Sequence, residues 1–121
     1  MSLRKVVVAD DDGAGRELIR EVLETSGYEV IEAVDGIEAL REVRRSLPDL
    51  VLVDIQMPLL DGYGVLRELR ADLRFCGLRV VAMTALAMLR DQEEGRHAGF
   101  DGYITKPVDI AILRAEIRRF F

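Results

Sequence analysis

The stretch that decides the fold is Leu50-Val51-Leu52-Val53-Asp54, four aliphatic residues that run directly into one carboxylate. Pro48 precedes this run and Pro58 follows it, so the apolar segment is short and bounded on both sides. Such a run is typical of a strand buried on both faces, as in a parallel sheet covered by helices. Asp54 is therefore expected at the carboxyl end of a buried strand, which is where open α/β sheets place their chemistry.

The composition is that of an ordinary globular chain with an acidic balance. We expect the 121 residues to form one domain, 1–121. The formal net charge of −5 argues against nucleic acid as a direct partner, because phosphate binding needs a basic face. The one cysteine, Cys76, excludes a disulfide framework, and no apolar run is long enough to span a membrane. We therefore expect a cytoplasmic protein.

Five short apolar runs alternate with segments of helical periodicity. Strands are expected at Lys5–Ala9, Tyr28–Ala33, Leu50–Val53, Arg79–Met83 and Gly102–Thr105. Helices are expected at Arg16–Ser26, from Asp35 to Ser46, at Tyr63–Ala71, at Ala85–His97, and from Asp109 to the end of the chain. Strict alternation predicts an α/β fold with a parallel sheet and helices on both faces. Five strands favour a single doubly wound domain in the flavodoxin-like order 2-1-3-4-5.

Helix ends and core faces are also predicted. Asp12, Asp35 and Asp109 are expected N-caps, and Gly27 is an expected helix stop. Helical spacing marks four core faces: Leu18, Ile19, Val22 and Leu23; Ile37, Leu40, Val43 and Leu47; Val65, Leu66 and Leu69; and Ile110, Leu113, Ile117 and Phe120. These faces would pack the helices onto the sheet.

Polar residues collect at one edge of the predicted sheet. The ends of the first, third, fourth and fifth strands carry Asp10 and Asp11, Asp54, Thr84 and Lys106. Three adjacent carboxylates are unfavourable, because like charges disfavour joint ionisation. A hard divalent cation such as Mg²⁺ would offset this by accepting oxygen ligands, and the lysine would pair with the remaining charge. Such a site suits phosphoryl chemistry, in which a carboxylate can form an aspartyl phosphate.

The motifs at these strand ends resemble those of the receiver domain of two-component response regulators. They are Val8-Ala9-Asp10-Asp11-Asp12, Leu52-Val53-Asp54-Ile55-Gln56-Met57-Pro58 with Asp61-Gly62, Met83-Thr84-Ala85, and Tyr103-Ile104-Thr105-Lys106-Pro107. The resemblance covers essentially the whole chain. It implies a signalling switch of a phosphorelay rather than an enzyme, although such a domain takes part in its own phosphoryl transfer and autodephosphorylation.

The resemblance also implies the acceptor and the metal ligands. Asp54 would accept a phosphoryl group from a sensor histidine kinase or a histidine phosphotransfer protein. Asp10 and Asp11 would bind Mg²⁺ together with Asp54 and the backbone carbonyl of Gln56, and Mn²⁺ would be able to substitute.

The family's switch maps onto the last two strands. Thr84 and Lys106 would contact the phosphoryl group, and the Lys106–Pro107 peptide bond would be cis. Movement of the Thr84 hydroxyl would let the Tyr103 ring turn inward and remodel the face of the fourth helix, fifth strand and last helix. This face would bind a downstream protein, and the chain would be a monomer or a phosphorylation-dependent dimer. Half-buried packing is the alternative role for Tyr103.

Two other classes of function compete with a switch. A Mg²⁺-dependent phosphatase with an aspartyl nucleophile usually carries a second acid two residues further on, where this chain has Gln56. A binding module without phosphoryl turnover would lack Asp54, Asp11 or Lys106, and all three are present. We therefore favour the switch. No output domain follows the last helix, so we expect either a stand-alone regulator or a receiver excised from a larger regulator or hybrid kinase.

Overall fold

The computed structural model describes residues 3–85 and 99–121, which contain five parallel strands in one sheet. The strands are β1 (Lys5–Ala9), β2 (Glu29–Ala33), β3 (Leu50–Asp54), β4 (Arg79–Ala85) and β5 (Gly102–Lys106). The helices within these ranges are α1 (Gly13–Thr25), α2 (Gly36–Ser46), α3 (Gly62–Ala71) and α5 (Ile110–Arg118). The order β2-β1-β3-β4-β5 confirms the predicted doubly wound α/β fold. The helix predicted at Ala85–His97 falls on residues 86–98, outside the described residues, and Ala85 itself ends β4.

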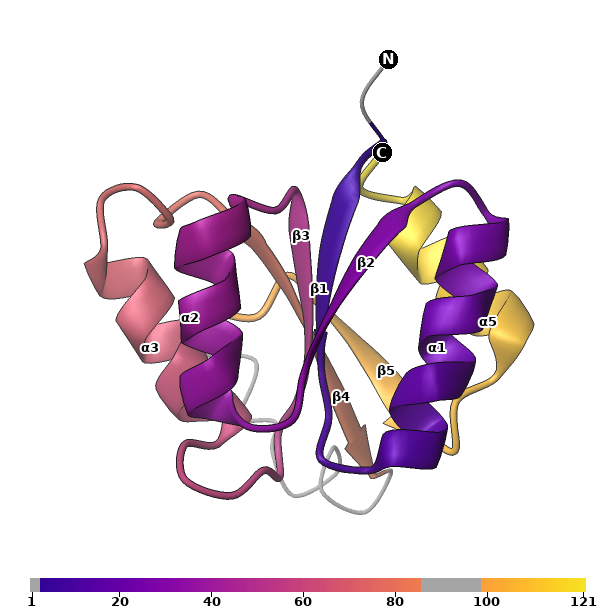
Figure 1. The fold of residues 1–121 in the computed structure, drawn as a ribbon, viewed down its shortest axis with the longest axis horizontal. Coiled ribbons are helices and arrows are strands. Elements are labelled where there is room, and N and C mark those ends of the chain that lie inside the picture. Colours follow the sequence, from indigo (N-terminus) through magenta and orange to yellow (C-terminus); the bar gives the residue numbers. More distant parts are fainter. Residues whose placement is uncertain (1–2, 86–98) are drawn as a thin grey trace.

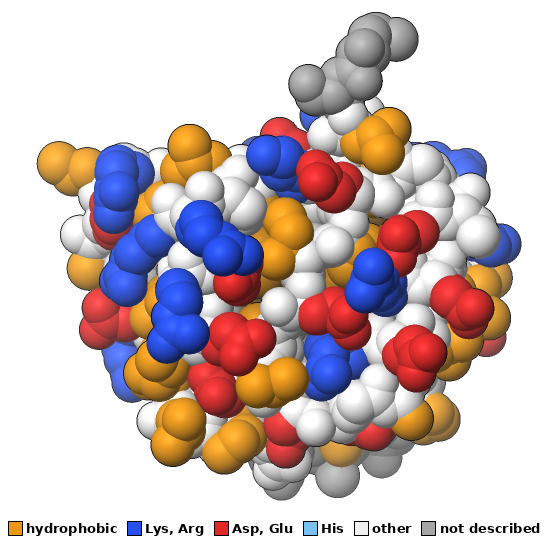
Figure 2. All heavy atoms as spheres, viewed as in Figure 1, with side chains coloured by type: hydrophobic (Ala, Val, Ile, Leu, Met, Phe, Trp, Pro, Cys, Tyr) orange, Lys and Arg blue, Asp and Glu red, His pale blue; other side chains and the backbone are white. Residues whose placement is uncertain are grey.

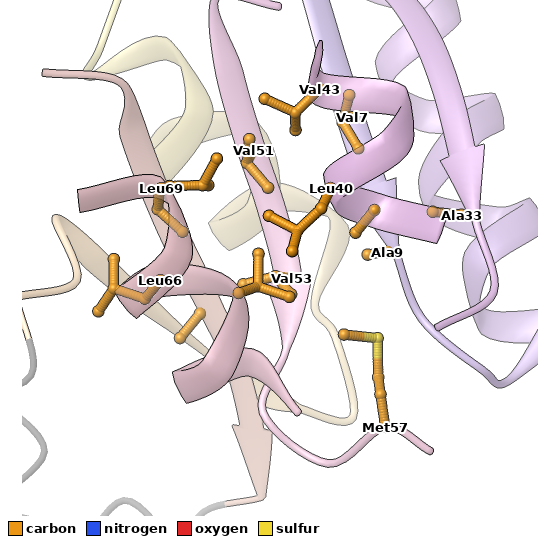
Figure 3. Packing of buried hydrophobic residues seen from close by; sticks show 14 of the residues in the cluster. Val7, Ala9, Ala33, Leu40, Val43, Val51, Val53, Met57, Leu66 and Leu69 are labelled. Carbon is orange, nitrogen blue, oxygen red and sulfur yellow. The ribbon is translucent and has the colours of Figure 1, made fainter. Parts of the chain in front are cut away.

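The sheet has a separate hydrophobic core on each face. In Figure 1, α2 and α3 cover one face and α1 and α5 cover the other. Successive strand residues point to opposite faces, so Val7 and Val51 join the α2–α3 core whereas Val8 and Leu52 join the α1–α5 core. Figure 3 shows Leu40 of α2 packed against strand side chains of the first core. The central strands are therefore buried on both faces, as the sequence predicts.

Most of the predicted helix ends are correct. The side chains of Asp35 and Asp109 accept hydrogen bonds from the backbone N–H groups of the third helical residues, at 2.7 and 3.0 Å, and Gly27 has a positive φ of 93°. Asp12 lies at the N-cap position of α1, but its side chain makes no capping hydrogen bond. The predicted N-cap position of Asp12 is therefore confirmed, but its side chain does not form the cap. Its carboxylate lies beside Gly15 instead, where the absence of a side chain leaves room for it.

Four residues assigned to the core are exposed instead. They are Leu18, Ile37, Leu47 and Ile110. Ile37 and Ile110 lie in first helical turns, and Leu47 follows the last turn of α2, so all three lie at helix ends. Leu18 lines an open cavity beside Ile19, which fills the core position in its place. Helical spacing thus identified the core-facing side of each helix but not its extent.

The β3–α3 loop is pressed against the start of α2. A Cβ atom added to Gly36 would overlap the backbone carbonyl of Leu60 in that loop. The loop is also tied to the end of β3, because the N–H of Gly62 donates to the carbonyl of Ile55 at 2.9 Å. This contact holds the chain that follows Asp54 in one position.

We therefore predict that Gly36→Ala lowers the free energy of unfolding by roughly 1–3 kcal/mol, the usual effect of overpacking, despite the better helix propensity of alanine. Urea denaturation measures the change. Gly77→Ala is the matched control: nothing lies within 4 Å of its added Cβ atom. We expect it to change stability by less than about 0.5 kcal/mol. Equal stability of the two variants would contradict the close approach at Gly36.

Candidate functional site

Two buried carboxylates lie at the carboxyl ends of adjacent strands. Asp54 is the last residue of β3 and is 6% exposed, and Asp10 directly follows β1 and is 1% exposed. The strands pair in parallel, with Ala9 opposite Val53, so the following residues emerge side by side. The N–H of Gln56 donates to Asp54 Oδ1 at 2.9 Å, and the N–H of Asp12 donates to Asp10 Oδ1 at 2.9 Å. Backbone geometry thus holds both carboxylates at this edge.

The third acid of the cluster is Asp11. One carboxylate oxygen from each of Asp10, Asp11 and Asp54 lies within 4.8 Å of the others. Asp11 is exposed, so the cluster opens to solvent on one side. Such a concentration of negative charge is unfavourable without a cation to offset it.

Lys106, the last residue of β5, brings a cation to the two buried acids. Its Nζ donates to Asp10 Oδ2 at 3.0 Å and also to Asp54 Oδ2. Burial raises the pKa of Asp54, and the neighbouring Asp10 adds to this, although Lys106 and the Gln56 N–H oppose it. Burial works against the Lys106 ammonium as well, but its hydrogen bonds to Asp54 and Asp10 prevail and raise its pKa. One ammonium therefore offsets the buried negative charge only in part.

An open cavity of about 290 Å³ lies over these groups. Its lining is Asp11, Asp54, Gln56, Thr84, Ala85 and Lys106. Thr84 is buried, and its hydroxyl donates to the carbonyl of Ala85 at 3.4 Å, a long bond that is readily exchanged for a better acceptor. The cavity thus joins a carboxylate, a hydroxyl and an ammonium around a space large enough for a small anionic group.

Tyr103 belongs to an aromatic row beside this site. Its ring meets that of Phe100 edge-on, with 5.8 Å between the ring centroids, and the Phe100 centroid lies 5.7 Å from that of Tyr63 in α3. Tyr103 is half-buried and does not line the cavity over Asp54. At the other end of β5, the Lys106–Pro107 peptide bond is cis.

The donors of the acid cluster fit a hard divalent cation. Asp10, Asp11 and Asp54 offer carboxylate oxygens only, which suit Mg²⁺ rather than a thiolate-binding or imidazole-binding metal. The open side at Asp11 leaves room for the water molecules that Mg²⁺ retains. Gln56 follows Asp54 by two residues in the β3–α3 loop, and the role of its backbone carbonyl as a ligand stays a prediction.

Sequence reasoning missed Arg16. Its Nη1 donates to the backbone carbonyl of Asp10 at 2.6 Å, and its Nε donates to Glu32 Oε1 at 3.0 Å. A contact to a backbone carbonyl carries no signal in the sequence. The opposite charges of Arg16 and Glu32, 16 positions apart, become neighbours only once α1 lies against β2.

The fold and the site together define a phosphoacceptor module of the receiver type. The family model described as "Response regulator receiver domain" matches residues 6–118. The chain belongs to the response regulator receiver domain family. Receiver domains are the signalling domains of two-component systems rather than enzymes in the usual sense.

The relatives of this chain differ in how much of their own length it covers. The chain is 37% identical over 114 residues to the DNA-binding dual master transcriptional regulator RpaA of Synechocystis sp., covering 94% of this chain and 47% of that protein. It is 38% identical over 107 residues to the polar-differentiation response regulator DivK of Brucella anthropi, covering 88% of this chain and 87% of DivK. The chain thus spans about half the length of RpaA and most of DivK.

A solved structure adds a metal-bound neighbour. The receiver domain of a Pseudomonas aeruginosa sensor histidine kinase, which holds a magnesium ion in its active site cleft, superposes with a TM-score of 0.89. The two chains are 32% identical, and 98% of each is covered. Among the described residues of the present chain, no helix is long and apolar enough to cross a membrane.

The raised pKa of Asp54 predicts a pH-dependent stability. Because folding raises this pKa, the ionised carboxylate destabilises the fold above its unfolded pKa, and this penalty disappears as pH falls through the folded value. Without divalent cations at pH 7, Asp54→Asn should therefore be more stable than the wild type in urea denaturation. The gain should shrink as the pH is lowered.

Asp72→Asn is a control of opposite sign. Hydrogen bonds from Arg74 lower the pKa of Asp72, so its carboxylate stabilises the fold above the unfolded pKa, and this contribution is lost as pH falls. Asp72→Asn should accordingly not stabilise the chain at pH 7. A wild type more stable than Asp54→Asn in metal-free buffer would show that burial of Asp54 carries no penalty.

Proposed function

We propose that this chain is a phosphorylation-activated switch in which Asp54 accepts a phosphoryl group from a histidine kinase or a histidine phosphotransfer protein. One observation carries the proposal: Asp54 is a buried carboxylate whose charge is only partly offset by Lys106, and it faces an open cavity that also presents Thr84. We propose that residues 1–121 form one receiver domain. The exposed free thiol of Cys76 favours a reducing cytoplasmic location.

The proposed transfer needs little covalent chemistry from the protein. A carboxylate oxygen of Asp54 attacks the phosphorus of the donor phosphohistidine, and the P–N bond breaks. The imidazole keeps the electron pair and takes up a proton, and Asp54 becomes an aspartyl phosphate. Lys106 already contacts Asp54, so its ammonium is placed to neutralise phosphoryl oxygens that replace the carboxylate charge.

The acid cluster is the proposed cation site. Asp10, Asp11 and Asp54, with the backbone carbonyl of Gln56, would hold Mg²⁺, and Mn²⁺ would be able to substitute. When bound, the cation supplies positive charge that stabilises the phosphoryl oxygens during transfer. The Pseudomonas aeruginosa receiver domain with magnesium in its cleft supports this assignment.

Thr84 and Tyr103 are the proposed readout. The weakly bonded hydroxyl of Thr84 lines the cavity and is free to exchange its 3.4 Å bond to Ala85 for a phosphoryl oxygen. Tyr103 lies on the neighbouring strand, where it pairs with Ala82, two residues before Thr84, and its ring meets Phe100 edge-on. A displaced Thr84 hydroxyl would change the space available to this ring. The surface of β5 and α5 would then present a different shape to a downstream protein partner or a second copy of the chain.

Acetyl phosphate with Mg²⁺ tests phosphoryl uptake. Intact mass spectrometry should show the mass of one added phosphoryl group on the wild type and none on Asp54→Asn, because that variant lacks the nucleophile. EDTA should abolish the addition. Asp49→Asn, an exposed acid far from the cavity, is the control that should be modified like the wild type. Failure of the folded wild type to gain this mass would contradict the proposed function.

Ring resonances test the switch. In protein labelled on tyrosine, phosphorylation should shift the Tyr103 signal, and Thr84→Val should strongly reduce that shift while slower phosphoryl uptake continues. Asp54→Asn protein treated in the same way is the reference, and its Tyr103 signal should not shift. An equally large Tyr103 shift in Thr84→Val would show that the hydroxyl does not couple the two residues.

A further inference from the structure

Arg16 ties the acidic loop at residues 10–12 to the edge strand β2. Its guanidinium spans two partners, the backbone carbonyl of Asp10 at 2.6 Å and the carboxylate of Glu32 at 3.0 Å. Its side chain is only 17% exposed, so both bonds are partly shielded from water. Figure 1 shows α1, which carries Arg16, running alongside β2. The residue lines neither the cavity over Asp54 nor the acid cluster.

The bonded carbonyl belongs to the peptide group between two acids of the cluster, so this contact affects both of them. The peptide group that joins Asp10 to Asp11 is planar, so a bond that fixes the Asp10 carbonyl also fixes the orientation of the Asp11 N–H. That plane sets how the two side chains diverge. The remaining polar groups of Asp10 already have partners in the described structure: Ala33 for the N–H, and Asp12 and Lys106 for the carboxylate. Arg16 completes this set through the backbone carbonyl of Asp10.

The first turn of α1, which directly follows the loop, is intrinsically weak. α1 begins with Gly13, and Gly15 follows in the same turn. Glycine costs up to about 1 kcal/mol relative to alanine in a helix. Asp12, which would ordinarily cap the helix, makes no side-chain capping bond. A charged hydrogen bond from Arg16 therefore holds a turn that the local sequence leaves loose.

Glu32 keeps the guanidinium in place. Glu32 lies on β2 opposite Val8, which precedes Asp10 by two residues on the neighbouring strand. The Glu32 carboxylate also accepts a hydrogen bond from Arg20 at 2.7 Å. Burial by itself raises the pKa of Glu32, but the hydrogen bonds from Arg20 and Arg16 prevail and lower it. The carboxylate is thus ionised at neutral pH. Figure 2 shows acidic and basic side chains intermixed over this side of the molecule.

We propose that Arg16, held by Glu32, is a positioning residue that orients Asp10 and Asp11 for a divalent cation. The inference rests on the proposed Mg²⁺ site, but Arg16 itself does not touch the cation. It acts through the Asp10 carbonyl, so its loss misaligns the acids without removing a ligand.

Arg20 provides a matched control. Like Arg16 it lies on α1 and donates to Glu32, but its second hydrogen bond goes to Glu24 rather than to the acidic loop. Arg16→Met and Arg20→Met each remove one guanidinium from Glu32, and only the first frees the Asp10 carbonyl. An effect of the ion pair on stability alone would therefore appear in both variants.

The test is a Mg²⁺ titration of the isotopically labelled, unphosphorylated chain, followed by the amide resonances of residues 10–12. We expect Arg16→Met to weaken Mg²⁺ binding roughly tenfold and Arg20→Met to stay within about twofold of the wild type. Amide hydrogen exchange of Asp12, whose N–H bonds Asp10 Oδ1, should accelerate in Arg16→Met without any metal. Arg16→Lys keeps the positive charge but loses the planar guanidinium that reaches two partners at once, so it should also bind Mg²⁺ more weakly than the wild type.

Two results separate the possible failures. Equal Mg²⁺ affinity and equal Asp12 exchange in Arg16→Met and Arg20→Met would overturn the positioning role and leave the proposed function intact. A folded wild type that binds no Mg²⁺ would overturn the proposed metal site, and the metal-free exchange would then decide the role of Arg16 alone. If Arg16→Met does not fold, Arg16→Lys and Glu32→Gln answer the same question.

Discussion

The burial of two carboxylates beside a single ammonium is the constraint on which the site depends. Parallel pairing of β1, β3, β4 and β5 brings Asp10, Asp54 and Lys106 to one edge of the sheet, where Lys106 contacts both acids. The raised pKa of Asp54 shows that this arrangement leaves the charge incompletely offset. A carboxylate whose charge is only partly offset, in an open cavity, favours the binding of a cation and a reaction that redistributes its charge. This incomplete charge balance therefore supports both parts of the proposed function, the binding of a cation and the acceptance of a phosphoryl group by Asp54.

The same edge links the chemistry to surfaces on both sides of the sheet. Toward β5, Thr84 lines the cavity with a weakly held hydroxyl, and Tyr103 lies on the next strand. Toward β2, Arg16 and Glu32 hold the acidic loop through a backbone carbonyl. Thr84 and Tyr103 would transmit a change in charge at Asp54 to the surface. Arg16 and Glu32 would keep the acids of the cation site correctly oriented. The central strands that separate these two regions are packed on each face.

Sequence reasoning succeeded where one physical rule dominates. Hydrophobic runs and their alternation predicted the strand order, and parallel topology then predicted that the acids and Lys106 would meet. It failed where tertiary contacts decide. Helical spacing alone could not show that Leu18 lines a cavity or that Ile37, in the first turn of α2, is exposed. The bond from Arg16 to the Asp10 carbonyl depends on the approach of α1 to β1, which no local pattern encodes.

Locating the phosphoryl group within the chain is the most direct measurement. Borohydride reduction converts an acyl phosphate on an aspartate into homoserine, which survives digestion and peptide sequencing by mass spectrometry. After treatment with a phosphoryl donor and Mg²⁺, homoserine should replace aspartate at Asp54 alone. Homoserine at Asp10, Asp11 or another acid, or its absence from a chain that has gained phosphoryl mass, would contradict the assignment of Asp54 as the acceptor.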